Sequence, residues 1–166
     1  MVILGIDPGS VRVGYGVIRV NGNKIGYVRS GLLKTGKSLS ESLRAIELDL
    51  EKIIRETKPE RAGIEKLFFV KNQKTGIRVA EARGILLNTV AKAGLKIVEL
   101  APTEVKLAVT GNGSASKEAV AKMVRYFVRL PENKTADDVT DALAIAIAAA
   151  GERWEGGLTG ATASLY

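Results

Sequence analysis

The sequence predicts an α/β protein built on a five-stranded mixed β-sheet with α-helices on both faces. Two observations predict this class. The chain opens with three strand-like segments separated by turn residues, as in an antiparallel meander. Further strand-like segments then alternate with helical ones, the pattern of parallel strands joined by helices. No linker or repeat divides residues 1–150, so we expect one domain there, followed by a flexible Gly- and Thr-rich tail over residues 151–166.

Apolar, β-branched runs between turn residues define the strands. The first run, Val2 to Ile6, reads as a strand buried on both faces, with Asp7 at its end and a turn at Pro8-Gly9. The fourth resembles it, because Glu65 stands near its end as Asp7 does on the first. The other strands are expected at about residues 11–20, 24–34, 61–67 and 96–100.

Apolar spacings of three and four residues define the helices. Ser38 to Glu41 reads as a capping box that opens the first helix, which ends before Pro59. Its apolar face is expected to comprise Leu39, Leu43, Ile46, Leu50, Ile53 and Ile54. The last helix is apolar on nearly all sides and should be buried. The remaining helices are expected at about residues 74–93, 102–109, 117–129 and 136–150.

Missing residue types limit the possible chemistry. The chain has no cysteine and no histidine, which excludes a Ser-His-Asp triad, a thiolate nucleophile and zinc sites built on Cys or His. Any metal must therefore bind oxygen ligands, which points to magnesium, manganese or calcium. No apolar run reaches the ~20 residues that cross a bilayer, and no signal peptide is recognisable. A cytoplasmic location is expected.

The net charge of +7 and the isoelectric point near 9.7 favour a polyanionic partner. The segment from Lys66 to Lys106 carries eight basic and three acidic residues and so supplies +5 of this charge. An ordinary solvated helix face is the alternative interpretation.

Four carboxylates stand where they could converge. Asp138 and Asp141 are three residues apart at the start of the last helix, so they share a face that could meet the strand ends carrying Asp7 and Glu65. Two Mg²⁺ ions about 3.5–4 Å apart would neutralise such a cluster, one activating a water and the other stabilising a departing 3′ oxygen. The alternatives are local capping, by Asp7 of its own turn and by Thr135 or Asp137 of the helix.

Six segments together resemble bacterial Holliday-junction resolvases of the RuvC type. They are GIDPGSVRVGYGVI, IEKLFFVKN, AEARG, APTEVK, GNGSASK and ADDVTDALAIA, and they extend over about residues 1–150. Asp-Pro-Gly alone also occurs in actin-like ATPases and RuvX-like nucleases. The resemblance implies an RNase H-like fold, a homodimer and Mg²⁺-dependent paired nicking of four-way DNA junctions. It also suggests a branch-migration motor, RuvA and RuvB, as a partner, and allows Mn²⁺ to substitute for Mg²⁺.

The resemblance also implies roles for individual residues. Asp7, Glu65, Asp138 and Asp141 match the metal-binding catalytic carboxylates, although Asp137 adds a neighbouring acid. Lys106 and Lys117 match lysines that bind phosphates or assist cleavage, the alternative being solvated surface lysines.

Further positions match the DNA-contacting part of the family. Phe68 occupies an aromatic position suited to stacking on an unpaired base, whereas core packing is the alternative for Phe68 or Phe69. Arg83-Gly84 suits either close helix packing or a dimer contact. Contacts to the DNA backbone are expected from Lys71, Asn72, Lys74 and Arg78.

Other functions remain open at this point. A RuvX-like nuclease acting on RNA would share the fold but is usually shorter. A basic DNA-binding module without catalysis would not need all four acids. An actin-like ATPase would need a second lobe that 166 residues cannot hold.

Overall fold

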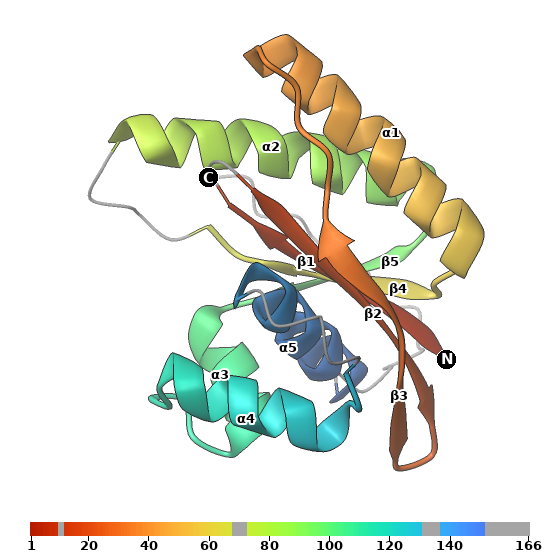
Figure 1. The fold of residues 1–166 in the computed structure, drawn as a ribbon, viewed down its shortest axis with the longest axis vertical. Helices are drawn as coiled ribbons and strands as arrows, with labels where there is room; N and C mark the ends of the chain where they lie inside the picture. Colours follow the sequence, from red (N-terminus) through yellow and green to blue (C-terminus); the bar gives the residue numbers. More distant parts are fainter. Residues whose placement is uncertain (10–11, 68–72, 131–136, 152–166) are drawn as a thin grey trace, which may run out of the picture.

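A five-stranded sheet lies between two helical layers (Figure 1). The computed structural model describes residues 1–9, 12–67, 73–130 and 137–151. Its strands are β1 (Val2–Pro8), β2 (Val13–Asn21), β3 (Lys24–Leu32), β4 (Arg61–Glu65) and β5 (Lys96–Leu100). Its helices are α1 (Leu39–Thr57), α2 (Gln73–Lys92), α3 (Pro102–Thr110), α4 (Lys117–Phe127) and α5 (Asp137–Gly151).

The sheet is mixed, with strand order β3-β2-β1-β4-β5. The first three strands pair antiparallel, and β4 then pairs parallel to both β1 and β5. Helices α1 and α2 cover one face, whereas α3, α4 and α5 cover the other (Figure 1). The predicted fold class is therefore confirmed.

Each face of the sheet contributes to its own hydrophobic core. Along β1, Leu4 and Ile6 pack in the core under α1 and α2, whereas Ile3 packs in the core that contains α5. This alternation follows the two-residue period of a strand. The central strand is thus buried on both sides, as its continuous apolar run predicts.

Most element boundaries agree with the sequence-based expectations. The capping box is present, because the Ser38 hydroxyl accepts from the Glu41 amide and the Glu41 carboxylate accepts from the Ser38 amide. The first strand runs one residue beyond Asp7, through Pro8, which pairs with Val13. The prediction that Leu39 belongs to the buried face of α1 is wrong. This side chain is 51% exposed because the first turn of α1 extends beyond the sheet.

Helix α5 packs unusually closely on the sheet. Gly5 pairs with Gly16 of β2 and with Gly63 of β4, so three glycines form one row across neighbouring strands. A Cβ atom on Gly5 would lie 2.0 Å from the carbonyl oxygen of Ala142. At the other end of the helix, the buried Arg61 donates to the carbonyl oxygen of Ala149 at 2.8 Å. These contacts fix the N-terminal turn of α5 beside the ends of β1 and β4.

A search of the described helices finds none that is both long and apolar enough to span a membrane. The expected tail, residues 151–166, lies outside the described residues after Gly151.

Candidate active site

Two acidic residues lie side by side at the ends of the central parallel strands. Ile6 of β1 pairs with Ile64 of β4, and the next residues along these strands are Asp7 and Glu65. Both acids lie two residues beyond glycines of the row under α5, so they face the α5 side of the sheet. Parallel strands end at the same edge, which is why the sequence could place these two carboxylates together.

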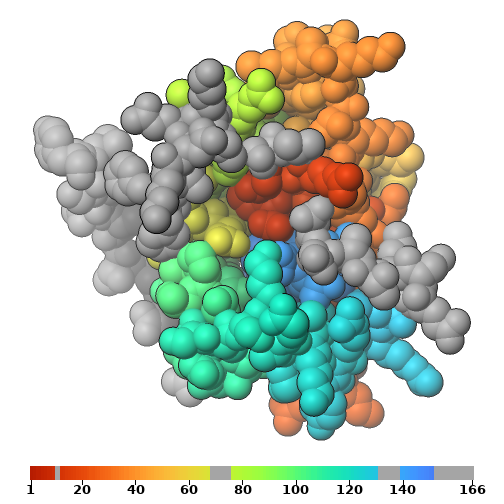
Figure 2. All heavy atoms as spheres, turned by 60° about the vertical axis from the view of Figure 1, so that its left-hand side comes forward, coloured from red at the N-terminus to blue at the C-terminus, as the bar shows by residue number. Residues whose placement is uncertain are grey.

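Asp141 approaches the same edge from α5. It precedes Ala142, the residue whose backbone lies against Gly5. Asp7, Glu65 and Asp141 line one cavity of about 280 Å³, together with Lys106 of α3 and Lys117 of α4. The apolar part of its wall comes from Pro102, Val105, Val120, Ala144 and Ile145. Five predicted site residues from five different elements thus meet in one place. In Figure 2, N-terminal residues (red) and α5 (blue) meet above α3 and α4 (green and cyan).

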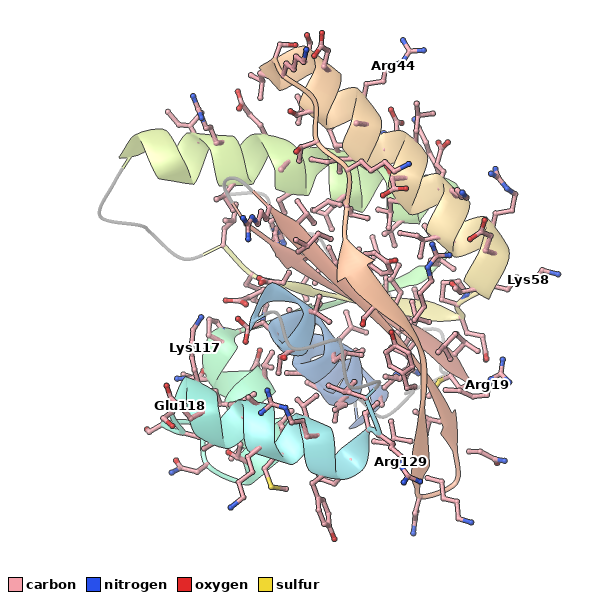
Figure 3. All side chains as sticks on the ribbon, viewed as in Figure 1. Arg19, Arg44, Lys58, Lys117, Glu118 and Arg129 are labelled. Atoms are coloured by element: carbon pink, nitrogen blue, oxygen red, sulfur yellow. The ribbon has the colours of Figure 1, made fainter. Side chains whose placement is uncertain are left out.

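Lys117 is paired with Asp141 across the cavity. Its Nζ lies 3.4 Å from Asp141 Oδ2, although the lysine side chain is 77% exposed and the aspartate side chain 31% exposed. Lys117 is the first residue of α4, a helix capped by the Ser116 hydroxyl, which accepts from the Ala119 amide. Figure 3 shows Lys117 at this N-terminal end of α4. The cap therefore fixes the backbone from which the lysine reaches the acids.

Burial raises the pKa of the Glu65 carboxyl above its ordinary value. The nearby Asp141 carboxylate raises this pKa further, whereas the Lys117 ammonium group opposes the rise. In the absence of a bound cation, ionised Glu65 is thus disfavoured by both desolvation and a like charge. A cation between the two acids would remove that repulsion.

The donor atoms that line the cavity suit a hard divalent cation, since the acids offer carboxylate oxygens and the chain has no Cys or His. Among the side chains that the structure describes, no group of three acids is close enough to hold one metal ion. The fourth predicted ligand, Asp138, lies in the first turn of α5, but its side chain is outside the described set. The residues present therefore fit such an ion in the chemistry of their donor atoms.

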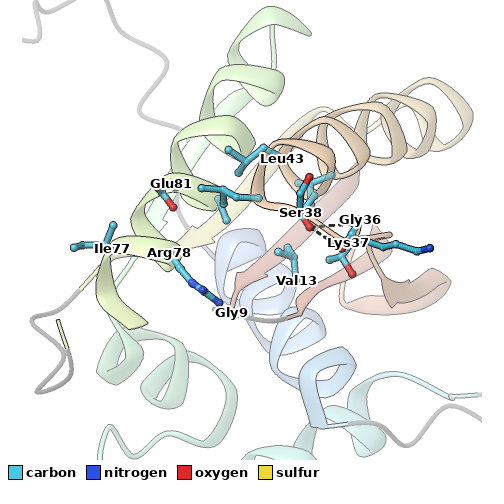
Figure 4. Close-up of a pocket in the computed structure, with 14 residues that line it drawn as sticks. Gly9, Val13, Gly36, Lys37, Ser38, Leu43, Ile77, Arg78 and Glu81 are labelled. Atoms are coloured by element: carbon cyan, nitrogen blue, oxygen red, sulfur yellow. Dashed lines mark hydrogen bonds between the residues drawn. The ribbon is translucent and has the colours of Figure 1, made fainter. Parts of the chain in front are cut away.

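The predicted DNA contacts fall mostly outside the described residues. The structure does not describe Phe68, Phe69, Lys71 or Asn72, and it does not describe the side chain of Lys74 in the first turn of α2. Arg78 is exposed on α2 and does not line the acidic cavity. It lines a larger one of about 560 Å³ between α1 and α2, where Figure 4 shows it reaching toward Gly9.

Arg83 has a role that the sequence left undecided. Its Nε donates to the backbone carbonyl oxygen of Glu65 at 3.2 Å, and its guanidinium group pairs with Glu99 of β5. Arg83 therefore ties α2 to the strand end that carries Glu65, whereas no atom lies within 4 Å of a Cβ added at Gly84, so close helix packing does not explain the glycine. Only the three-dimensional pairing of β4 with β5 reveals this contact.

Comparison with known proteins identifies the family. The sequence profile of "Crossover junction endodeoxyribonuclease RuvC" matches residues 3–149. The chain belongs to the RuvC family. The RuvC protein of Heliobacterium modesticaldum is 45% identical over 152 residues, which cover 90% of this chain and 94% of that protein. The RuvC protein of Prochlorococcus marinus is 46% identical over 150 residues, which cover 89% of this chain and 96% of that protein.

A solved RuvC structure supports the same conclusion. Thermus thermophilus RuvC in complex with a Holliday junction substrate superimposes with a TM-score of 0.84 at 33% identity, covering 90% of this chain and 93% of that one. The RNase H-like fold expected from the resemblance is therefore confirmed. The fowlpox virus resolvase, at 13% identity and a TM-score of 0.59, shares the fold alone. RuvC proteins are crossover junction endodeoxyribonucleases, which are hydrolases.

Proposed function

We propose that this protein is a structure-selective endodeoxyribonuclease that resolves four-way DNA junctions in recombination and repair by paired, symmetric nicks. One observation carries the proposal: three carboxylates and two lysines from five elements line a single cavity in a chain of the RuvC family. A RuvX-like RNA nuclease and a non-catalytic DNA-binding module are less well supported. The RNA nuclease is less well supported because the family profile that matches this chain is that of RuvC. The DNA-binding module is less well supported because it would not need acids gathered around one cavity.

In this proposal Asp7, Glu65, Asp138 and Asp141 hold two Mg²⁺ ions, for which Mn²⁺ can substitute. When bound, such ions supply an activated water and stabilise the charge on the leaving oxygen. The oxygen-only donor set and the raised pKa of Glu65 support this assignment. Lys117 neutralises part of the charge on Asp141 and holds that carboxylate in place.

The overall reaction is hydrolysis of one phosphodiester bond in each of two strands. The oxygen of a water molecule bonds to phosphorus while the bond from phosphorus to the 3′ oxygen breaks, leaving a 3′-hydroxyl and a 5′-phosphate. Lys106 and Lys117 lie on the cavity wall, where their ammonium groups can attract the phosphate. Ligase can rejoin these ends because symmetric cuts leave nicked duplexes.

DNA recognition is assigned to the segment after β4 and to α2. Phe68 stacks on an unpaired base at the crossover, and Phe69 is the second aromatic residue proposed to contact DNA. Backbone contacts come from Lys71, Asn72, Lys74 and Arg78. A homodimer presents two such sites to strands of like polarity, and a motor of the RuvA and RuvB type supplies the junction. Since the proposed substrate is four-way junction DNA in recombination and repair, the cytoplasm is the proposed location.

Incubation with a synthetic four-way junction, a linear duplex and RNA hairpins tests the proposal directly. Cleavage should require Mg²⁺, stop in EDTA and favour the junction over the other substrates. In a junction with arms of equal length, products of equal length should appear from two strands of like polarity. Cutting that persists in EDTA, or that shows no preference for the junction, would rule out this function.

A further inference from the structure

Helix α4 carries a basic face that leads away from the candidate active site. We define the α4 basic face as Lys122, Arg125, Tyr126 and Arg129. Lys122 and Arg125 are exposed and three residues apart, so they share one side of the helix, and Arg129 follows two residues after its end. Figure 3 shows Lys117 and Arg129 at opposite ends of α4.

The cations of this face are available to bind a partner. Within the part of the chain that the structure describes, Lys122, Arg125 and Arg129 form no ion pair or hydrogen bond through their side chains. Residues 117–130 contain four basic residues and one acid, a net charge of +3. Helix α1, on the opposite layer, contains three basic residues and five acids, a net charge of −2. The positive charge is thus concentrated on α4 and the residues that follow it, in contrast to α1.

An exposed tyrosine lies among these cations. Tyr126 is 80% exposed, the highest exposure of any large hydrophobic residue among those described. Its ring contacts Phe127 edge-on, with centroids 5.7 Å apart and an interplanar angle of 72°. Phe127 in turn packs against the core. The tyrosine ring is therefore held outward with its hydroxyl group in solvent, where it can donate a hydrogen bond to a phosphate.

We propose that the α4 basic face binds the sugar-phosphate backbone of one duplex arm of the junction, outside the crossover. This inference rests on the proposed function, because the DNA must enter the cavity where α4 begins. Charge complementarity selects a polyanion, and the DNA proposed to be cut is the polyanion that reaches the start of α4 at Lys117.

The length of α4 indicates which phosphates are bound. At 1.5 Å per residue, Arg125 lies roughly 12 Å beyond Lys117, and Arg129 lies at most roughly 18 Å beyond it. With nucleotides about 3.4 Å apart along a duplex strand, these distances correspond to about three to five nucleotides from the scissile phosphate. The α4 basic face would thus add affinity without reading the sequence.

Salt dependence of binding tests the proposal with a matched control. The α4 variant is Lys122→Gln, Arg125→Gln and Arg129→Gln, and the control variant is Arg44→Gln, Arg55→Gln and Lys58→Gln. Both lower the net charge from +7 to +4. The control residues are exposed on or just after α1, and Figure 3 shows Arg44 and Lys58 pointing outward at α1, on the other side of the sheet from Lys117. Junction binding is measured in EDTA over a range of salt concentrations.

The slope of log K against log salt should fall in magnitude by about two to three for the α4 variant, since each lost phosphate contact removes about 0.9. Affinity near 0.1 M salt should fall at least about tenfold. The slope of the control variant should match that of the wild type. An equal loss of slope in both variants would show that only the net charge of the protein matters, which would overturn the proposal. An unchanged slope in the α4 variant would overturn the proposal, and it is also the result expected if this face binds another protein.

Replacing chosen phosphates of the DNA with uncharged methylphosphonates shows where along the strand the α4 basic face makes contact. Methylphosphonates about three to five nucleotides from the cut should weaken binding of the wild-type protein and the control variant but not of the α4 variant. Equal weakening in all three proteins would overturn the assignment. Wild-type protein that neither binds nor cuts junctions would contradict the proposed function instead, so the two failures are distinguishable.

Discussion

Asp7 lies at the end of the central strand, where β1 meets β4 and α5, and it lines the cavity with Glu65 and Asp141. The substitution Asp7→Asn keeps the shape but removes a negative charge from the proposed metal site. Cleavage of a four-way junction should fall at least about a thousandfold, because stabilisation of the transition-state charge by metal is worth several kcal/mol. Binding of the junction in EDTA should stay within a few-fold of wild type.

Glu51→Gln is the matched control for this substitution. Glu51 is exposed on α1, on the opposite layer, so its loss should leave cleavage unchanged. Near wild-type cleavage by Asp7→Asn would contradict the assignment of the metal ligands.

Glu65 makes the stability of the metal-free protein depend on pH. Its pKa is raised in the folded state by burial and by Asp141, in spite of Lys117, so folding favours the protonated form. The resulting stabilisation is complete below the unfolded value near 4.5 and is lost as pH rises through the folded pKa. Glu65→Gln cannot ionise, so it should be more stable than wild type at neutral pH, and this difference should vanish in acid.

Thermal unfolding in EDTA from acid to neutral pH measures this difference in Tm. Adding Mg²⁺ should raise the Tm of the wild type more than that of Glu65→Gln, because only the wild type keeps the full ligand set. A variant that is less stable than wild type at neutral pH without metal would contradict the electrostatic argument.

At the scale of elements, the position of α5 depends on the glycine row beneath it. Gly5→Ala would place a methyl group 2.0 Å from the Ala142 carbonyl oxygen, so the helix must move away from the sheet. Overpacking costs 1–3 kcal/mol and occasionally more, and we expect about 3 kcal/mol here because backbone atoms clash. Asp141 would move with Ala142, so cleavage should fall as well.

Gly84→Ala provides the comparison. No atom lies within 4 Å of the added methyl group, and Gly84 is inside α2, so this change should stabilise the protein by about 0.5–1 kcal/mol. Urea denaturation of both variants gives the two free energies of unfolding. Similar values would contradict the close packing of α5.

The same elements show how much the sequence predicts. Periodicity and local turn chemistry identify β5 at its observed bounds, the capping box of α1 and the strand ends that carry Asp7 and Glu65. These features depend on neighbours along the chain. The glycine row could not be predicted in this way, because it exists only once β2, β1 and β4 pair in register.

The same limit applies within the candidate site. The type and spacing of the acids indicate metal chemistry, but the pairing of Lys117 with Asp141 depends on how α4 packs against α5. The bond from Arg83 to the Glu65 carbonyl likewise needs α2 to lie over the end of β4. Sequence patterns therefore predict which acids gather at the candidate site better than the contacts that position them.

At the scale of the whole molecule, one sheet separates two cores and brings Asp7 and Glu65 of the candidate site to one edge. The described residues of both cores all precede the end of α5, and Ala149 contributes to the core that contains α5. Arg61 fixes the last turn of α5 from the start of β4. Within the described residues, the cavity is lined by side chains of β1, β4, α3, α4 and α5.

Removal of residues 152–166 tests whether the domain ends with α5. The chain truncated after Gly151 should unfold in one transition with a Tm close to that of the full chain, because both cores and the Arg61 contact are retained. It should also cut a four-way junction at the wild-type rate. Calorimetry and the junction assay on both proteins provide the comparison. A fall of several degrees in Tm would show that the tail packs on the domain, and a slower rate at unchanged Tm would assign the tail to DNA binding.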